Sequence, residues 1–144
     1  MSVNCMLDSG ATHSFVHPRI VQTTEAQPSE GAVLTVTVAN GSKLLCNDVR
    51  SLDLTFMAEG GDRQVTVSLQ LYVLDGLLSN VILGMDFLKR YNPSISWINC
   101  RVGMPCLTAN GTVCQSSGND VAKVVVCSDH RDMSKCSNGV LCKN

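Results

Sequence analysis

Asp8, Ser9 and Gly10 are the residues of this chain whose types and spacing most readily suggest chemistry. They follow a short apolar run at residues 5–7, and apolar character returns at Phe15 and Val16. A carboxylate between two strand-like runs is costly to bury unless it is hydrogen-bonded or used in function. Asp-Ser-Gly is also ordinary turn chemistry, and on the tripeptide alone a plain turn is the more common interpretation.

A second stretch of the sequence favours a functional role for Asp8 over a plain turn. Residues 81–88, V-I-L-G-M-D-F-L, indicate a short apolar strand that ends at Gly84 and is followed by a helix-like run. Together with D-S-G-A-T-H-S-F-V at residues 8–16, they resemble the retropepsins, the dimeric aspartic proteases of retroviruses and retrotransposons, and most of all the gypsy-type branch. The resemblance covers residues 4–98, and Asp8 and Gly84 stand 76 positions apart (84 minus 8) in the family's order.

The resemblance implies an all-β, closed-barrel protomer with a flap hairpin and one short C-terminal helix. The residue patterns add strands over 50–57 and 64–74, because apolar residues alternate on both sides of a Gly-Gly turn. They also add a helix over 85–91 that stops at Asn92-Pro93, and one helical turn over 17–21. In retropepsins the strand and helix around Gly84 support the catalytic loop, which implies that role for Ile82, Leu83 and Gly84.

An Asn-Gly pair between two strand-like runs predicts a hairpin near residue 40, because both residues tolerate positive φ. A plain surface hairpin is the commoner use of such a turn. The resemblance instead places a flap here, a mobile hairpin that closes over bound peptide and excludes water. The predicted flap and substrate-binding residues are Ala39, Asn40, Gly41 and Ser42.

Peptide hydrolysis without a metal or a covalent intermediate needs a base to activate water and an acid to protonate the leaving group. Two adjacent carboxylates that share one proton can do both. The chain has one Asp-Ser-Gly, so the partner of Asp8 must come from a second copy across a two-fold axis. In the surrounding loop, Ser9 is expected to bond across the interface, Gly10 to bring its N–H to the carboxylate, and Ala11 and Thr12 to complete the site.

The composition narrows the other classes of function. With 144 residues, 44% of them hydrophobic and 16% charged, the chain is long and apolar enough for one domain with a core. The net charge of −1 offers no basic field for nucleic acid. No apolar run approaches the ~20 residues of a membrane span, and the start lacks a signal-peptide layout. We therefore expect a cytoplasmic protein, or one inside a retrotransposon particle, without cofactor, metal, membrane or nucleic-acid partner.

The last third of the chain has a different character, so we divide the chain into a protease domain, 1–98, and a cysteine-rich extension, 99–144. Six of the eight cysteines lie in this extension, at 100, 106, 114, 127, 136 and 142. Reduced thiols are the expected state, although a disulfide-stapled tail is an alternative. Zinc binding is a further alternative, but the spacing C-x2-H-x5-C-x5-C of Cys127, His130, Cys136 and Cys142 fits no common knuckle.

Three rival functions remain. Asp8, His13 and Ser14 contain the residue types of a catalytic triad, but such a short local segment rarely converges them. Cys5 could act as a thiol nucleophile, yet an apolar strand is the setting of an inert cysteine. Only seven residues precede Asp8, fewer than retropepsins have, which favours a truncated, inactive relic or a dimerising interaction module.

The sequence therefore predicts an aspartic endopeptidase that acts as a homodimer and cleaves a retrotransposon polyprotein, with Asp8 as the catalytic carboxylate. The inactive retropepsin-like relic is the alternative.

Overall fold

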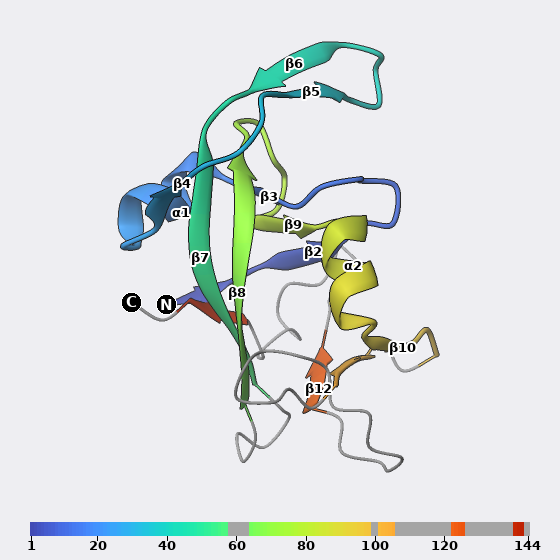
Figure 1. Ribbon diagram of the computed structural model, residues 1–144. Coiled ribbons are helices and arrows are strands. Elements are labelled where there is room, and N and C mark those ends of the chain that lie inside the picture. The colour runs from blue at the N-terminus through green and yellow to red at the C-terminus, as the bar shows by residue number, and fades with distance from the viewer. Residues whose placement is uncertain (58–63, 99–100, 106–121, 126–139, 143–144) are drawn as a thin grey trace.

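The computed structural model describes residues 1–57, 64–98, 101–105, 122–125 and 140–142. Strands dominate, as expected for an all-β protein, and two short helices accompany them (Figure 1). The strands are β1 (Ser2–Val3), β2 (Cys5–Leu7), β3 (Phe15–Val16), β4 (Gln27–Ser29), β5 (Leu34–Thr37), β6 (Lys43–Cys46), β7 (Val49–Met57), β8 (Gln64–Val73), β9 (Val81–Leu83), β10 (Ser94–Ser96), β11 (Arg101–Met104), β12 (Ala122–Val125) and β13 (Val140–Cys142). The helices are α1 (Pro18–Thr23) and α2 (Met85–Tyr91).

The main sheet has the strand order β1-β13-β7-β8-β3-β9-β2, and β4 pairs with β7 beside this path. The central feature is β9, which runs parallel to β2 on one side and antiparallel to β3 on the other. Strands β2 and β3 therefore lie on opposite sides of β9, although β9 (Val81–Leu83) follows β3 by some 65 residues in the sequence. This crossing places residues 8–14 as a loop at the end of β9.

The hairpin of β7 and β8 forms the long wall of the molecule, and its two strands lie side by side in Figure 1. The predicted alternation is confirmed, since Leu52, Leu54 and Phe56 are buried on one face. On β8 the buried residues Leu69 and Leu71 lie opposite Leu52 and Arg50. Burial of branched side chains on one face of a pleated ribbon is what fixes its register.

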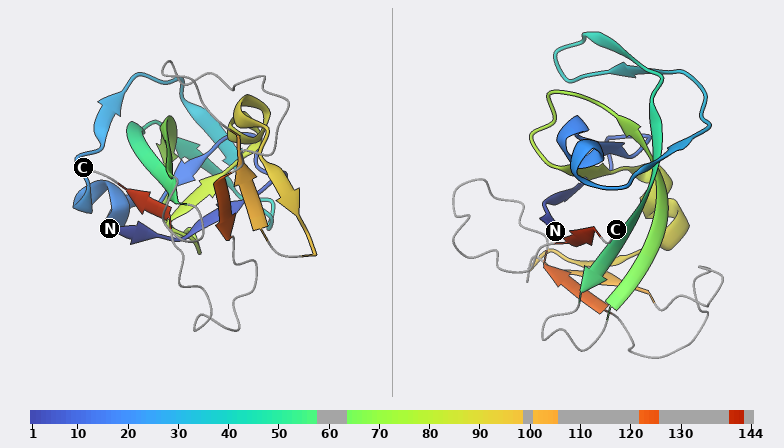
Figure 2. Two further views of the ribbon diagram at one scale, coloured as in Figure 1. Left: turned by 90° about the horizontal axis from the view of Figure 1, so that it is seen from below. Right: turned by 90° about the vertical axis from the view of Figure 1, so that its left-hand side faces the viewer.

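The predicted hairpin around residue 40 is β5 and β6, which stand apart from the main sheet in both side-on views (Figures 1 and 2). Its turn is closed by main-chain bonds from Val38 N to Ser42 O (2.9 Å) and from Gly41 N to Val38 O (2.8 Å). Gly41 has φ +83°, the left-handed region that favours glycine. The Asn40 side chain accepts the Ser42 N–H at 2.9 Å, which reinforces the turn.

Both helices fall where the residue patterns place them. Helix α2 follows Gly84 and ends at Asn92, whose φ of 43° is a left-handed cap, and Pro93 prevents continuation. The single turn expected near Pro18 is longer than predicted and forms the six-residue helix α1. The His17 ring accepts the Arg19 N–H, and this cap supplies the start that the proline alone does not.

The core lies between the inner face of β7 and β8, the short strands β3 and β9, and helix α2. Phe87 and Tyr91 of α2 are buried there, and Phe87 stacks on Phe56 at 5.9 Å between ring centroids. The fully buried members also include Val16, Leu54, Leu71, Val81 and Leu83. Helix α2 is thus fixed behind the loop at residues 8–14 by apolar packing.

A second sheet, β10-β11-β12, begins directly after α2. Strand β13 lies between β1 and β7 in the main sheet, so residues 140–142 pair with both the chain start and the long hairpin. The division at residue 98 stays a prediction. Within the described residues the main sheet runs from β1 to β2 without joining its ends, so the closed barrel also stays a prediction.

Some sequence predictions fall outside the described residues. These are the Gly-Gly turn between β7 and β8, the positions of five tail cysteines, and three of the four zinc candidates, Cys127, His130 and Cys136. In the described part of the chain, no helix is both long and apolar enough to cross a membrane.

Candidate active site

Asp8 stands directly after β2, where the parallel pairing with β9 ends. Its N–H donates to Leu83 O at 3.0 Å, which continues the ladder by one bond. Its carboxylate Oδ1 accepts the Gly10 N–H at 2.8 Å, and its carbonyl accepts the Ala11 N–H at 3.2 Å. A Cβ on Gly10 would lie only 3.1 Å from Asp8 Oδ1. The expected approach of the Gly10 N–H to the carboxylate is therefore present in this geometry.

Gly84 is the position where strand β9 meets the Asp8 loop most closely. A Cβ there would lie 2.3 Å from His13 O and 2.8 Å from Ala11 O, so no other residue fits without moving the backbone. The neighbouring Met85 N–H donates to Ala11 O at 2.8 Å. Leu83 and Gly84 thus brace the loop through main-chain atoms, while Ile82 pairs with Met6 and Phe15 on either side.

Asp86 holds the far end of the loop, a role that the sequence did not reveal. Its Oδ1 accepts the Ser14 hydroxyl at 2.6 Å and its Oδ2 accepts the Ser14 N–H at 2.9 Å. Oδ1 also accepts the Phe87 N–H at 2.7 Å, and Ser14 Oγ accepts the Gly84 N–H at 3.0 Å. A carboxylate inside the otherwise apolar run V-I-L-G-M-D-F-L was the signal that could have suggested this anchor.

The triad alternative does not agree with this geometry. Ser14 Oγ donates to Asp86, and the His13 Nδ1 pairs with Thr12 Oγ1 at 2.9 Å. The His13 ring lies edge-on to Tyr72, with centroids 5.5 Å apart. Among the described residues, Asp8, His13 and Ser14 form no relay of nucleophile, base and acid, although they share one loop.

The other predicted loop residues lie near Asp8 and differ in exposure. Ser9 and Thr12 are exposed, whereas Ala11 is half-buried. The flap residues 39–42 are exposed as well, and no hydrogen bond joins them to the Asp8 loop within the described residues. The roles expected for Ser9, Ala11, Thr12 and the flap turn stay predictions.

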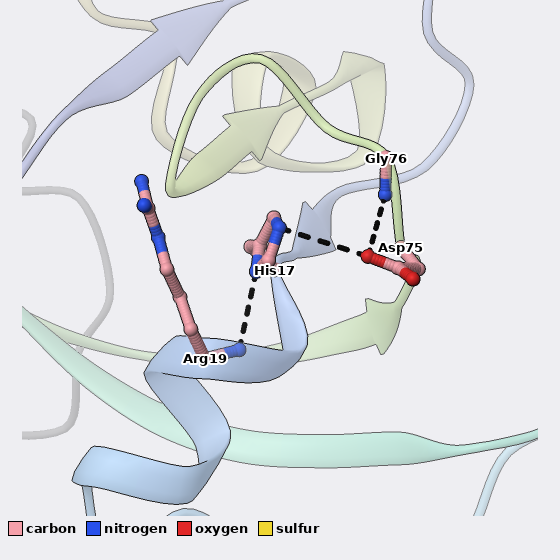
Figure 3. A network of polar contacts seen from close by, with 4 residues as sticks. All are labelled: His17, Arg19, Asp75 and Gly76. Atoms are coloured by element: carbon pink, nitrogen blue, oxygen red, sulfur yellow. Dashed lines mark hydrogen bonds and ion pairs between the residues drawn. The ribbon is translucent and has the colours of Figure 1, made fainter.

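The loop between β8 and β9 is held by a small polar network around His17 (Figure 3). His17 Nδ1 accepts the Arg19 N–H at 3.1 Å, so the neutral ring carries its proton on Nε2. That atom faces Asp75 Oδ1 at 3.7 Å, and the same oxygen accepts the Gly76 N–H at 2.8 Å. The His17 N–H donates to Asn80 O at 2.9 Å. Helix α1 therefore anchors both ends of the loop that leads into β9.

The thiol alternative at Cys5 and the zinc alternative in the tail stay untested predictions. Cys46 is buried at the end of β6, and burial raises the pKa of its thiol, which lowers the thiolate fraction at neutral pH. No group of three or more histidine, cysteine or acidic side chains that could hold a metal ion occurs among the described residues. These observations concern the described part of the chain alone.

Comparison with known families identifies the class of this domain. The family model of the PEG10/RTL1 protease domain matches residues 4–117. The match makes this a retropepsin-like domain of the kind found in genes derived from gypsy-type retrotransposons, as the two motifs predicted. The chain belongs to the PEG10/RTL1 protease domain family. No curated protein and no solved structure matches it.

Proposed function

We propose that this chain is an aspartic endopeptidase that acts as a homodimer, with Asp8 of each copy forming the catalytic pair. The two carboxylates share one proton, so one activates water as a base while the other protonates the leaving amine. The titration then belongs to the pair and not to either residue. The substrate is an extended segment of a retrotransposon-type polyprotein, bound as an added strand beneath the flap.

The observation that carries this proposal is the state of the Asp8 carboxylate. Its loop is fixed by bonds to Leu83 and Met85, yet among the described residues the carboxylate itself accepts one bond, from Gly10. An ionisable group that is held in place but left with free acceptor positions is suited to proton transfer. The same loop contains no second carboxylate, so a partner must supply it.

The exposed apolar residues after α2 support a dimer. Ile95, Trp97 and Ile98 are 37%, 82% and 95% exposed, although aromatic and branched residues are usually covered. They belong to β10 and its following turn, and β10 is the outer strand of its sheet among the described strands. Contiguous apolar residues at a strand edge are typical of surfaces that associate. We propose that this edge contributes to contact between two copies.

We also propose that the barrel is closed and that Ser9 bonds across the dimer interface. The proposed location of the protein is the cytoplasm. The flap turn at Asn40 and Gly41 would cover the peptide, exclude water and strengthen the interactions of the carboxylate pair.

Replacing the carboxylate tests the proposal directly. Asp8→Asn should reduce cleavage of an unfolded protein substrate by about 10³-fold or more, since an amide cannot act as a base. Asp75→Asn is the matched control, because Asp75 also accepts a glycine N–H but its side chain is 88% exposed. The control should cleave like the parent chain. Equal cleavage by Asp8→Asn would refute the assignment.

Sedimentation equilibrium of the same proteins tests the dimer. The parent chain and Asp8→Asn should both sediment as dimers, and Trp97→Glu should shift the mass toward the monomer with loss of cleavage. A monomeric parent chain that cleaves peptide would refute the shared pair. A dimer without any cleavage would favour the interaction module.

A further inference from the structure

A cavity of about 590 Å³ is lined in part by His13 and Ser14 of the catalytic loop, and Asp8 is not among its lining residues. This volume falls within the ~300–1,000 Å³ of sites that hold ligands in proteins. Its walls come from the catalytic loop, the start of the flap stem, strands β7 and β8, and helix α2. The lining residues used below are Ser51, Ser68, Leu69, Gln70, Asp86 and Arg90.

The lining of the cavity shows which part of strand β8 it contacts. Successive side chains of a strand point to opposite faces. The cavity is nonetheless lined by the three consecutive residues Ser68, Leu69 and Gln70. A space that contacts both faces at once must run along the edge of the strand.

Main-chain groups along this edge of β8 have no strand partner among the described strands. Tyr72 N–H donates to Ser14 O and Leu74 N–H donates to Val16 O, both toward β3, whereas Val73 N–H donates to Asp48 O on the opposite side. Main-chain groups alternate between the two edges of a strand. Those of Ser68 and Gln70 therefore point to the same edge as Tyr72.

Strand β3 does not reach these two residues. It pairs with β8 at Tyr72 and Val73 alone, so from Gln64 to Leu71 the one neighbour of β8 among the described strands is β7. An open strand edge beside a cavity is the arrangement that accepts an added strand. The ligand that fits it is an extended peptide.

Arg90 and Asp86 are the fully charged side chains that line the cavity. Arg90, from the last turn of α2, is the one fully cationic side chain lining the cavity, and it forms no ion pair with the described residues. Its guanidinium lies 5.3 Å from the centre of the Tyr91 ring. Among the described residues, its N–H groups form no hydrogen bond. The acidic residue of the wall, Asp86, already accepts three bonds from Ser14 and Phe87. Asp86 keeps its negative charge, but its oxygens are largely occupied, so the Arg90 guanidinium is the charged group of the wall with hydrogen-bonding positions left for a ligand.

We propose that this cavity is a second peptide-binding site, which accepts an extended acidic segment as a strand beside Ser68 and Gln70, with a carboxylate on Arg90. The Ser51 hydroxyl and the Gln70 side-chain carbonyl, which are cross-strand neighbours, add polar partners. The site has a lining that contains neither Asp8 nor the flap turn at residues 39–42. It does not depend on cleavage.

The probe is the fluorescein-labelled peptide Thr-Val-Thr-Glu-Thr-Val-Thr, measured by anisotropy with the full chain carrying Asp8→Asn. Arg90→Glu should weaken binding about tenfold. The same variant should bind a probe with Lys in place of Glu about tenfold more tightly than the Asp8→Asn chain does. Lys89→Glu, one residue earlier on α2 and exposed, is the matched control and should change neither value beyond twofold.

Amide NMR spectra of the ¹⁵N-labelled chain locate the probe. Shifts at Ser68 and Gln70 support the proposal. Shifts confined to residues 8–12 and 39–42 would overturn it, as would the absence of binding at millimolar peptide or equal affinities of Arg90→Glu and Lys89→Glu. None of these outcomes bears on whether Asp8 is catalytic, which the cleavage assay decides separately.

Discussion

Asp8 and Asp86 are two carboxylates that bracket one loop, and they are used in opposite ways. Asp86 accepts three hydrogen bonds, two from Ser14 and one from Phe87. Within the part of the chain that the structure describes, Asp8 accepts one, from Gly10. A nearly saturated carboxylate such as Asp86, with three of about four acceptor positions occupied, stabilises the folded state through charge-assisted hydrogen bonds. An unsaturated one at the opposite end of the loop is left available for a proton, a water molecule or a partner.

Substitution of Gly84 should disturb the loop between the two carboxylates most severely. Gly84→Ala would place a Cβ 2.3 Å from His13 O, so the loop or β9 must move. We expect a loss of about 3 kcal/mol in the free energy of unfolding, at the upper end for overpacked sites, with loss of cleavage. Urea unfolding of the purified variant measures it.

Gly10→Ala is the matched control for that change. Its Cβ would meet only the Asp8 carboxylate oxygen, at 3.1 Å. It should lower cleavage with a far smaller effect on stability. Equal destabilisation by the two substitutions would contradict the tight contact assigned to Gly84.

Asp86→Asn sharpens the comparison between the carboxylates. The amide keeps one acceptor but turns an N–H₂ group toward Ser14, so a charge-assisted bond is lost and a donor faces a donor. We expect about 2 kcal/mol of destabilisation. Asp8→Asn should destabilise the chain by less than this, because the amide keeps the Oδ1 atom that accepts the Gly10 N–H.

Both variants can be compared in one urea series, with Asp75→Asn as an exposed reference. The contrast fails if Asp8→Asn destabilises the chain as much as Asp86→Asn does.

Gly41→Ala has the smallest expected effect on stability. Its φ of +83° would cost an alanine about 1 kcal/mol, and no atom lies within 4 Å of the added Cβ. Because the hairpin stands apart from the core, this strain should alter the flap and not the Asp8 loop. We expect a higher KM for peptide with thermal unfolding nearly unchanged. A large drop in Tm would show that the hairpin is part of the core.

Local patterns predicted the elements well. Alternation marked β7 and β8, the Asn40-Gly41 pair marked the hairpin of β5 and β6, and the Asn92-Pro93 stop marked the end of α2. These signals lie within a few residues of one another, and local propensity is sufficient to produce them. The strand pair that positions Asp8 followed from the family resemblance and not from periodicity.

Distant pairings were beyond the residue patterns. The bond between Ser14 and Asp86 joins residues 72 positions apart, so nothing near either residue reports it. The pairing of β13 with β1 and β7 likewise depends on tertiary packing. The cap by His17, which lengthens α1, uses a side chain that is uncommon at such positions and carries little predictive weight.

Among the described residues, most of the hydrogen bonds that hold the Asp8 loop to β8, β9 and α2 end on main-chain atoms of that loop. In these bonds the N–H groups of Asp8 and Ser14 donate, and the carbonyls of Ala11 and Ser14 accept. The Ser14 hydroxyl is the one side chain of the loop that takes part in them. The exposed side chain at position 9 can therefore change without shifting the carboxylate. Under the proposed function, peptide preference and catalytic geometry can evolve along independent routes in this domain.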